Sequence, residues 1–582
     1  MGHQVAGNKK SVPKFSRIRI QWKYKNYTHE TANWQFRQKF ANPNPHSFLS
    51  WRVPVTLVKF AFRVYCIQTM NNLWQFIQPS LQKFRDNPAW VIRGTPKRAV
   101  TYHEVYQATL AQARILSQSG IQPGDTVGIT APNGPEFCVA ALAAWKIGAV
   151  VAPIHQNYTE QEIASQIDAI KPKIVMTHDA RIEFSHYLQI DLNSRSGTAD
   201  MESVPATDLG DNAVAIRLYT SGSTGNPKIV RLSHKNIISN VLAALQLRKF
   251  DASDRFISLL PLSHAMGMTA TFMLPMYAGS CCITPRVIAA KEIIDTLNEE
   301  GISVLIAVPR LFRNIMQGLE SKFRQGPAPL RGYIWLIRNT PLSIRTIINA
   351  PIRKQLGGNI NCWVSGGSHL DGAVTRYFHQ LGIPLRQGYG LTETSPIAAL
   401  QEEYDSMLES VGKPIPECEA RVLNPDSAGS GEILLKGPNV MLGYEDQKQN
   451  DLAFDGPWFR TGDVGHIDDA GNITLTGRIK RLIVTEAGKN IYPEELETLL
   501  ERDPAVKEAG IFELDMKPVA VISTDAESPA DAAREAIRRF NASISSHNRI
   551  TRYAAVEELP RTPLGKIAFR KLPEAFAEHE LK

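Results

Sequence analysis

A repeated alternation of buried helix, glycine and β-branched strand runs along the chain up to about residue 400. The first example is GDTVGIT (124–130), a strand bounded by Gly and Pro, followed by PEFCVAALAAWKIGAVVAPI (135–154), a helix, a stop at Gly148 and a second strand. Strands that alternate with helices pair in parallel, because the chain must cross over the sheet between them. The sequence therefore predicts an α/β fold, with parallel sheets flanked by helices.

The pattern changes twice further along the chain. Residues 410–477 carry short strands and turns, such as GEILLKG (431–437), and predict a small β-rich subdomain. After Arg478 we expect an α+β segment with a strand (482–485), a helix (494–502), two strands (508–524) and a helix (529–541). We therefore expect a large N-terminal domain over 70–479 and a small mobile C-terminal domain over 480–582.

The positive charge is concentrated before residue 70. The whole chain has a net charge of +8, yet residues 1–69 hold twelve Lys and Arg and only one acid, Glu30. The remainder is close to neutral and shows no basic pattern for a nucleic acid, so we expect no nucleic-acid partner. We expect 1–69 to be a poorly ordered basic extension. Three interpretations stay open: an arm for an anionic surface, an unstructured leader, and an upstream translation of a chain that begins at Met70.

The cysteines and the hydropathy pattern indicate the cellular compartment that this chain suits. The six cysteines are scattered without a CxxC pair, which disfavours a disulfide framework or a zinc site and favours a reducing compartment. No apolar run of 18 residues is free of charge, so no membrane-spanning helix is expected. The best candidate, 53–67, contains Lys59 and Arg63. We expect a cytoplasmic protein.

The segment LYTSGSTGNPKIV (218–230) is the strongest local signal for chemistry. It follows a β-compatible run, and its small residues expose backbone N–H groups and hydroxyls while a lysine adds positive charge, as a polyphosphate requires. The pattern GxxxxGK[ST] is absent, so the loop is not a Walker A motif. The predicted phosphate-binding residues are Thr220, Ser221, Gly222, Ser223, Thr224, Gly225 and Lys228.

This loop resembles the signature of the adenylate-forming superfamily, which includes acyl-CoA synthetases, peptide-synthetase adenylation domains and firefly luciferase. Five more motifs of that family follow in the same order: SGGSHL (365–370), QGYGLTET (387–394), GEILLKGPNVMLGY (431–444), RTGDVG (460–465) with GRIKRLIVTEAGKNIYPEELE (477–497), and PRTPLGK (560–566). Together they cover about 70–582. The closest resemblance is to fatty acyl-CoA synthetases.

Several of these motifs also have a physical interpretation. Glycines after predicted strands let the backbone approach a flat base, and Tyr389 can stack on it. Thr392 and Glu393 place a hydroxyl beside a carboxylate, as Mg²⁺ on phosphate oxygens requires. The resemblance implies nucleotide binding by Gly367, Ser368, Gly388, Tyr389 and Gly390, ribose binding by Asp463 and Arg478, and metal binding by Glu393 and Thr224.

The resemblance also implies a two-step reaction with ATP, Mg²⁺ and coenzyme A as cofactors. A carboxylic acid and ATP would form an acyl-adenylate, and a thiol would then take the acyl group. The C-terminal domain would rotate about Lys480, bringing Lys566 to the first step and the loop around Gly488 to the thiol. His264, in PLSHAMGM (261–268), matches a position beside the carboxylate pocket. The implied catalytic residues are Lys566, Thr392, Glu393 and His264.

Two features bear on the substrate and on activity. Residues 310–354 hold nine basic residues and one acid, interleaved with apolar ones, which suits contact with an anionic membrane or a solvated helix face. The family usually has Gly after the loop lysine, whereas this chain has Ile229, which cannot adopt positive φ cheaply. The leading hypothesis is a fatty acid–CoA ligase. The alternatives are a ligase that forms acyl-AMP or uses an acyl carrier protein, and a non-catalytic acyl- or nucleotide-binding relative.

Overall fold

The computed structural model describes residues 24–28, 31–35, 50–54, 72–177, 187–189, 207, 209–210, 212–220, 228–325, 348–485, 490–524, 526, 528–562 and 566–581. The chain forms two compact units, Met1–Met70 and Asn71–Lys582. Every residue selected from the motifs belongs to the second unit. We describe each unit by itself.

In the first unit three short strands form an antiparallel sheet in the order β1-β2-β3. They are β1 (Tyr24–Thr28), β2 (Thr31–Gln35) and β3 (Ser50–Pro54), and β2 pairs with both neighbours. The strands contain Tyr, Thr, Trp and Val, which favour extended backbone. The expectation of a poorly ordered extension over 1–69 stays a prediction.

A seven-stranded sheet opens the second unit. Its order is β21 (Gly443–Tyr444), β11 (Lys228–Ser233), β10 (Val214–Thr220), β7 (Val150–Pro153), β6 (Thr126–Thr130), β8 (Ile174–Thr177) and β9 (Tyr187–Gln189). The strands from β10 to β9 run parallel, whereas β11 and β21 pair antiparallel. As predicted, a fully buried helix, α4 (Pro135–Lys146), leads through Gly148, at φ 78°, into β7.

A second sheet has nine strands. Its order is β18 (Lys413–Pro414), β17 (Ala399–Leu400), β16 (Leu385–Tyr389), β15 (Cys362–Ser365), β14 (Val304–Ala307), β12 (Arg255–Ile257), β13 (Cys281–Thr284), β4 (Pro88–Ile92) and β5 (Arg98–Thr101). The strands from β16 to β4 are parallel. Trp363, Phe312 and Phe378 pack together in one apolar core on this sheet. The predicted α/β fold with parallel sheets is confirmed.

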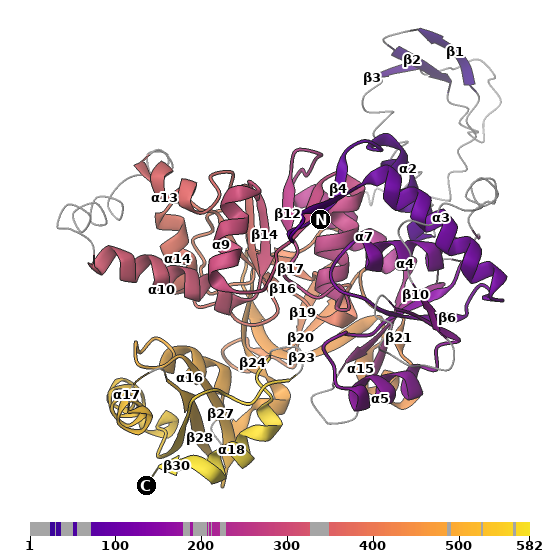
Figure 1. Ribbon diagram of the computed structural model, residues 1–582. Helices are drawn as coiled ribbons and strands as arrows, with labels where there is room; N and C mark the ends of the chain where they lie inside the picture. The colour runs from indigo at the N-terminus through magenta and orange to yellow at the C-terminus, as the bar shows by residue number, and fades with distance from the viewer. Residues whose placement is uncertain are drawn as a thin grey trace, which may run out of the picture. The chain divides into compact units, whose positions relative to one another are not determined.

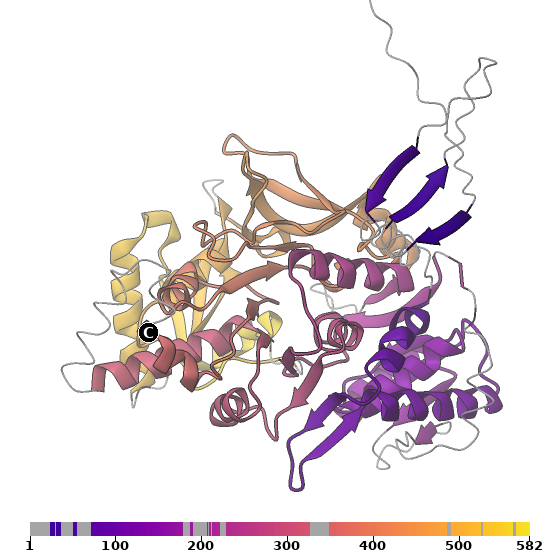
Figure 2. The same ribbon diagram turned by 90° about the horizontal axis from the view of Figure 1, so that it is seen from above.

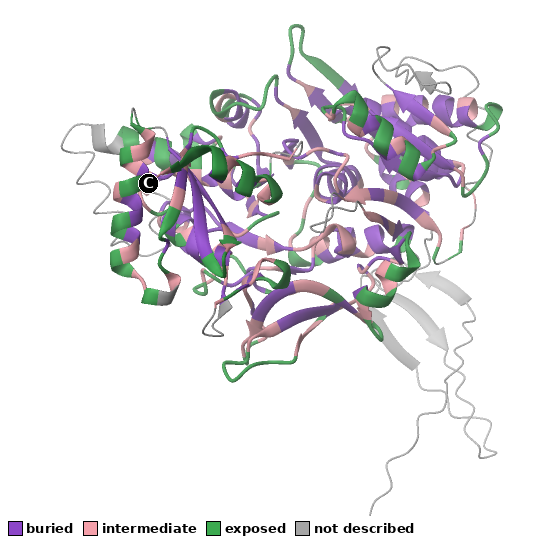
Figure 3. Ribbon diagram, turned by 90° about the horizontal axis from the view of Figure 1, so that it is seen from below, coloured by how far each residue is buried: buried purple, intermediate pink, exposed green. Residues whose placement is uncertain are grey.

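Helices flank these sheets, with the strands mostly buried and the helices partly exposed (Figures 1 and 3). Local sequence defines their starts: Thr101 and Glu104 form a capping box at α3, as do Thr159 and Glu162 at α5. The helices are α2 (Leu73–Lys83), α3 (Tyr102–Gln118), α5 (Glu160–Ile170), α7 (His234–Leu247), the π-helix η1 (Gly267–Met273), α8 (Leu274–Ala278), α9 (Ala290–Glu299), α10 (Pro309–Gln325), α13 (Ala350–Gln355), α14 (Gly372–Gln380) and α15 (Gln447–Ala453).

The region after residue 410 is rich in short strands, as predicted. One sheet contains β19 (Glu419–Leu423), β20 (Gly431–Lys436), β23 (Trp458–Ile467), β22 (Phe454–Asp455) and β24 (Ile473–Arg478). The C-terminal segment, yellow in Figures 1 and 2, is a sheet flanked by helices. Its elements are β25 (Ile483–Val484), β26 (Asn490–Ile491), α16 (Pro493–Leu500), β27 (Glu508–Leu514), β28 (Lys517–Ser523), α17 (Pro529–Ser543), β29 (Arg552–Val556), α18 (Leu572–His579) and β30 (Glu580–Leu581). The strands and helices expected over 482–541 are therefore present.

Ion pairs join this C-terminal segment to the helices of the nine-stranded sheet. Arg502 binds the Asp371 carboxylate with two nitrogens, at 2.9 and 3.1 Å, and Asp371 is buried. Arg313 of α10 lies 2.6 Å from Glu501. Bidentate pairs with a buried partner hold geometry better than exposed ones do. The C-terminal segment thus contacts α10 and α14 through these two ion pairs.

The same contacts revise one interpretation of the basic stretch 310–354. Arg313 binds Glu501, Arg310 lies 3.7 Å from Glu508, and Arg353 donates to the carbonyls of Gly382 and Ile360. These three basic side chains therefore serve contacts within the protein. Residues 326–347 of the stretch lie outside the described residues.

Within the described residues, no helix is both long enough and apolar enough to cross a membrane.

Candidate functional site

The predicted site residues follow the carboxyl ends of parallel strands in both sheets. Thr220 ends β10, Tyr389 ends β16, the Ser365–Gly367 turn follows β15, and His264 follows β12. Residues in such positions gather along one edge of a sheet. The Tyr444 hydroxyl of the seven-stranded sheet reaches Glu393, which follows β16, so the two edges meet at this site.

The predicted phosphate loop connects β10 and β11 as a hairpin. Thr220 pairs with Lys228, and its hydroxyl donates to the Lys228 carbonyl at 3.3 Å. The intervening residues Ser221, Gly222, Ser223, Thr224 and Gly225 lie outside the described residues. Two of the predicted phosphate ligands thus stand at the two ends of the loop, where antiparallel pairing holds them together.

Ile229 does not disturb this hairpin. It lies in β11 opposite Tyr219, and its carbonyl accepts a hydrogen bond from the Glu445 amide at 2.9 Å. It is absent from the residues with positive φ. β11 therefore needs only extended backbone at Ile229. How the loop before it closes stays a prediction, because residues 221–227 lie outside the described residues.

Glycines after β15 and β16 allow close approaches. Gly367 has φ 89°, a conformation that favours glycine, and Ser368 beside it is exposed. Gly388 lies in β16, where an added Cβ would sit 3.4 Å from Val364. A Cβ on Gly390 would collide with the carbonyl of Pro396. Packing alone therefore requires glycine at position 390, whether or not this residue also contacts a base as predicted.

The loop that carries Thr392 and Glu393 is held by hydrogen bonds from buried side chains. Its buried neighbour Thr394 bonds to Leu391 and Pro396 through its hydroxyl. The side chains of Asn240 and Asn439 both donate to the carbonyls of Thr394 and Ile397, at 2.8–3.2 Å. Because these buried amides are fully used, the loop presents Thr392 and Glu393 in one fixed orientation.

Asp463 is held by two partners. Its Oδ1 lies 2.8 Å from Nε of Arg478, and its Oδ2 accepts a 2.6 Å hydrogen bond from the Tyr389 hydroxyl. Burial raises the pKa of Asp463, and Arg478 and Tyr389 oppose that rise. A carboxylate has about four acceptor positions, so positions remain for ribose hydroxyls. Tyr389 packs in an apolar cluster with Ala399, and its link to Asp463 was not foreseen from the sequence.

Four cations gather around the two acids. Burial lowers the pKa of Lys480, and the charges of Lys228 and Arg478 lower it further. The pKa of Lys566 is also lowered, first by the surrounding protein and then by Arg478, while Glu393 opposes the shift. Positive charges that lower one another's pKa favour binding of an anion. The charges of Arg478 and Glu393 act on Lys566, an exposed residue of the last motif.

His264 lies beside a second histidine that the sequence analysis did not select. The rings of His264 and His155 are 5.9 Å apart, and His155 follows β7. Burial, His155 and Lys566 lower the pKa of His264 to about 4, so its imidazole is neutral at pH 7. Its buried Nε2 has no partner among the described residues. The sequence did offer one indication that His155 belongs to the site, because this residue directly follows the carboxyl end of a predicted strand.

Apolar side chains also border the site. Val308 directly follows β14 and remains 40% exposed, which is unusual for valine at a strand end. The Met266 sulfur lies 3.1 Å from where a Cβ on Gly366 would be, and Val308 lies 3.9 Å from the corresponding position on Gly367. Met266, Val308 and the two glycines thus form an apolar border next to His264.

Glu393 has the character of a ligand for a single hard cation. Its Oε1 accepts the Tyr444 hydroxyl, and no hydrogen bond to Oε2 is present within the described residues. No cluster of three or more His, Cys, Asp or Glu side chains suited to a metal occurs in that part of the chain. Mg²⁺ typically takes one or two carboxylates and completes its shell with water and substrate phosphates. A lone carboxylate facing several cations fits that arrangement; Thr224, the other predicted ligand, lies outside the described residues.

Gly488, predicted to line the path of the thiol, also lies outside the described residues.

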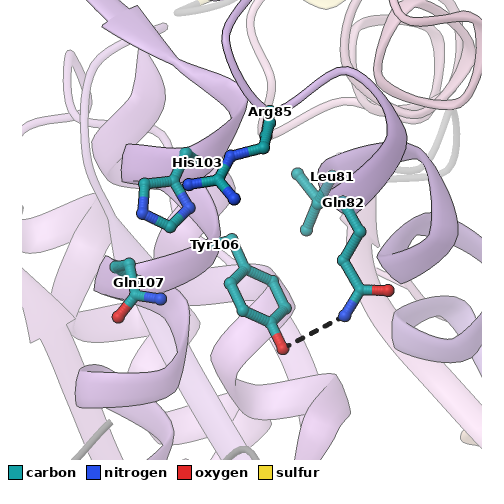
Figure 4. A pocket seen from close by; sticks show the side chains of 6 residues that line it. All are labelled: Leu81, Gln82, Arg85, His103, Tyr106 and Gln107. Atoms are coloured by element: carbon teal, nitrogen blue, oxygen red, sulfur yellow. Dashed lines mark hydrogen bonds between the residues drawn. The ribbon is translucent and has the colours of Figure 1, made fainter.

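A shallow surface pocket of about 180 Å³ lies elsewhere, between α2 and α3 (Figure 4). The Tyr106 hydroxyl accepts a 3.4 Å hydrogen bond from Gln82 at its rim. Its lining residues are Leu81, Gln82, Arg85, His103, Tyr106 and Gln107, none of which belongs to a motif. The pocket is therefore separate from the candidate site.

Comparisons with known proteins agree with this arrangement. The family model described as AMP-binding enzyme matches residues 77–445. The chain is 29% identical over 454 residues to a 2-succinylbenzoate–CoA ligase of Bacillus velezensis, covering 73% of this chain and 85% of that protein. It is 27% identical over 481 residues to the long-chain-fatty-acid–CoA ligase FadD15 of Mycobacterium bovis, covering 74% and 78%. The crystal structure of ATP-bound MatB from Rhodopseudomonas palustris superposes with a TM-score of 0.71 at 25% identity, covering 87% of this chain and 99% of that one.

The fold, the site and the extent of this match define a class: the chain belongs to the family of AMP-binding enzymes, within the adenylate-forming superfamily. The predicted class of acid–thiol ligase is confirmed, since the curated relatives are CoA ligases. The two relatives named above carry the names of different acids, so family membership does not select the acid.

Proposed function

We propose that this chain uses ATP to activate a fatty acid and transfers the acyl group to coenzyme A. In the first step a carboxylate oxygen bonds to the α-phosphorus as the bond to pyrophosphate breaks. In the second, the thiol loses its proton, its sulfur bonds to the acyl carbon, and AMP leaves. One observation carries the proposal: Tyr444 contacts both Glu393, through a 2.7 Å hydrogen bond, and the ammonium of Lys228, 4.2 Å from its ring, so the proposed metal ligand and the loop lysine meet at one site.

The residues at the site have different proposed roles. Lys228 and Lys480 supply positive charge for the phosphates, and Asp463 and Arg478 bind the ribose. Mg²⁺, bound at Glu393, would neutralise phosphate charge and polarise the phosphoryl group. Lys566 would hold the acid carboxylate against the α-phosphate and stabilise the charge that develops there. The Asp463–Arg478 and Glu393–Tyr444 contacts are already formed without substrate, as electrostatic catalysis requires.

The apolar border of Met266 and Val308 supports a fatty acid as the substrate. An exposed valine beside the carboxylate position can contact an alkyl chain, and each buried methylene is worth about 0.8 kcal/mol. The neutral imidazoles of His155 and His264 add no charge that would repel an apolar chain. The similarity to a long-chain-fatty-acid–CoA ligase points the same way.

We expect a panel of acids to show this selectivity. Pyrophosphate exchange should increase with alkyl chain length from acetate to medium or long chains, because each methylene adds apolar contact. An aromatic dicarboxylate such as 2-succinylbenzoate is the matched competitor. If it exceeds every fatty acid in kcat/KM, the fatty-acid assignment is wrong while the ligase class stands.

The choice of thiol is tested in the same assay. With adenylate formed, coenzyme A should give thioester and an acyl carrier protein should give none. Preference for the carrier protein would favour the alternative function. The non-catalytic alternative rests on Ile229, and acid-dependent pyrophosphate exchange by the wild-type chain would exclude it.

Deletion of residues 1–69 is expected to leave kcat/KM within about twofold of the full chain. All proposed site residues lie in the unit Asn71–Lys582, and the family match begins at residue 77. Thioester formation by the truncated and full chains is the measurement. A folded truncation that forms no thioester would contradict the expectation.

Membrane contact and a cytoplasmic location remain predictions from the sequence. Binding of the full and truncated chains to phosphatidylserine vesicles at low and high salt tests the basic extension directly. An electrostatic contact should weaken as salt rises.

A further inference from the structure

Tyr444 ends the fourth sequence motif and had no role in the sequence analysis. It lies in β21, the edge strand that pairs with β11 through Val230 opposite Tyr444. Only 4% of the residue surface is exposed. A buried tyrosine needs a partner for its hydroxyl, and the partner defines what the residue can do.

The hydroxyl partner is Glu393. The Tyr444 oxygen donates to Oε1 at 2.7 Å, the length of a strong hydrogen bond to a carboxylate. The Met441 amide, three residues earlier, donates to the Glu393 carbonyl at 2.8 Å. The same segment therefore holds both the side chain and the backbone of Glu393.

The aromatic ring has a second partner. The ammonium nitrogen of Lys228 lies 4.2 Å from the ring centroid, within the range of a cation–π contact. The adjacent backbone is tied as well, since the Glu445 amide donates to the carbonyl of Ile229. One residue thus contacts a carboxylate through its hydroxyl and a lysine through its ring.

We propose that Tyr444 is a positioning residue for the magnesium–nucleotide complex. Its hydroxyl turns Oε2 of Glu393 toward the metal, and its ring holds the Lys228 ammonium where it meets the phosphates. The inference rests on the proposed function only in that ATP and Mg²⁺ must bind; it does not depend on which acid is used. Residues that orient a ligand in this way affect metal affinity strongly, by about 10–100-fold.

Two substitutions separate the two contacts. Tyr444→Phe removes the hydrogen bond and keeps the ring. Tyr444→Leu removes both. Tyr404→Phe is the matched control, because the Tyr404 hydroxyl donates to the backbone carbonyl of Gly382 and touches no proposed site residue.

The first measurement is calorimetry of ATP binding to the full chain in Mg²⁺ and in EDTA. Mg²⁺ should strengthen ATP binding to the wild type, and this gain should shrink by about tenfold or more in Tyr444→Phe. ATP binding in EDTA should be unchanged in Tyr444→Phe and weakened in Tyr444→Leu, because only the second loses the Lys228 contact. Tyr404→Phe should match the wild type throughout.

The second measurement is kinetic. In pyrophosphate exchange, Tyr444→Phe should need about tenfold more Mg²⁺ for half the maximal rate, while kcat at saturating Mg²⁺ changes little. Conversion of supplied acyl-adenylate and coenzyme A to thioester should be unaffected, because that step uses neither the metal nor the Lys228 charge.

Two outcomes would overturn the inference. One is a Tyr444→Phe variant with the Mg²⁺ dependence of the wild type. The other is a variant that loses both half-reactions together with its melting temperature, which would make Tyr444 a packing residue only. Failure of the proposed function would give a different result. The wild-type chain would then bind ATP and Mg²⁺ but show no pyrophosphate exchange with any acid tested.

Discussion

Replacing Lys566 by alanine is expected to slow acyl-adenylate formation by 10²–10³-fold, or about 3–4 kcal/mol of transition-state stabilisation. We propose that this lysine, on which the charges of Arg478 and Glu393 act, holds the carboxylate against the α-phosphate. Pyrophosphate exchange measures the first step, and thioester formation from supplied acyl-adenylate measures the second. The second step should be nearly unchanged if, as the family resemblance implies, the C-terminal domain rotates and removes Lys566 from the site.

Lys571→Ala is the matched control. Lys571 is exposed and lies five residues along the chain in the short helix Phe569–Lys571, so losing its charge should cost almost nothing. Gly488→Leu should give the reverse of Lys566→Ala, keeping adenylation and losing thioester formation. If Lys566→Ala and Gly488→Leu lost both steps equally while folded, the rotating-domain account would fail for this chain.

The proposed rotation has a structural requirement. The pairs Arg502–Asp371 and Arg313–Glu501 join the C-terminal segment to α14 and α10, and they must break before another face of that segment can approach the site.

Replacing Glu393 by glutamine is expected to abolish the first half-reaction, with a loss on the order of 10²-fold or more. The amide oxygen can still accept the Tyr444 hydrogen bond, so the loop should keep its conformation while the anionic metal ligand is lost. The Mg²⁺ dependence of pyrophosphate exchange is the measurement. Thioester formation from supplied acyl-adenylate should survive.

The control for this substitution is Glu402→Gln. Glu402 is an exposed carboxylate whose partner Lys413 lies 3.4 Å away, outside the site. Its neutralisation should leave exchange unchanged. Exchange by Glu393→Gln at the wild-type rate would remove Glu393 from the metal site.

Much of this protein could be predicted from the sequence, because local patterns carry the information. The helix, Gly148 and strand order over 124–154 follows from hydrophobic periodicity and from the one residue that accepts φ 78° without strain. The ordered motifs likewise select Lys228, Glu393, Asp463 and Lys566, since each motif is a short contiguous segment.

Pairings across the chain could not be predicted in this way. The Tyr389–Asp463 hydrogen bond spans 74 residues of sequence, and the Tyr444–Glu393 hydrogen bond spans 51. His155 and His264, whose rings are neighbours, follow strands of different sheets. Ile229 is a related case: the family pattern draws attention to the backbone at this residue, and only the β10–β11 pairing shows that it lies in an extended strand.

The sequence by itself determined the α/β class, the family and the chemical types at the site, because periodicity, turn residues and motifs are local properties of the chain. Only the tertiary structure brings Arg310 and Arg313 to Glu508 and Glu501, and only the tertiary structure joins Lys228 to Glu393 through Tyr444. The physical reason is that charge and hydrogen-bond partners are selected by distance in space. Strand pairing and domain contacts set those distances, and residue spacing along the chain does not.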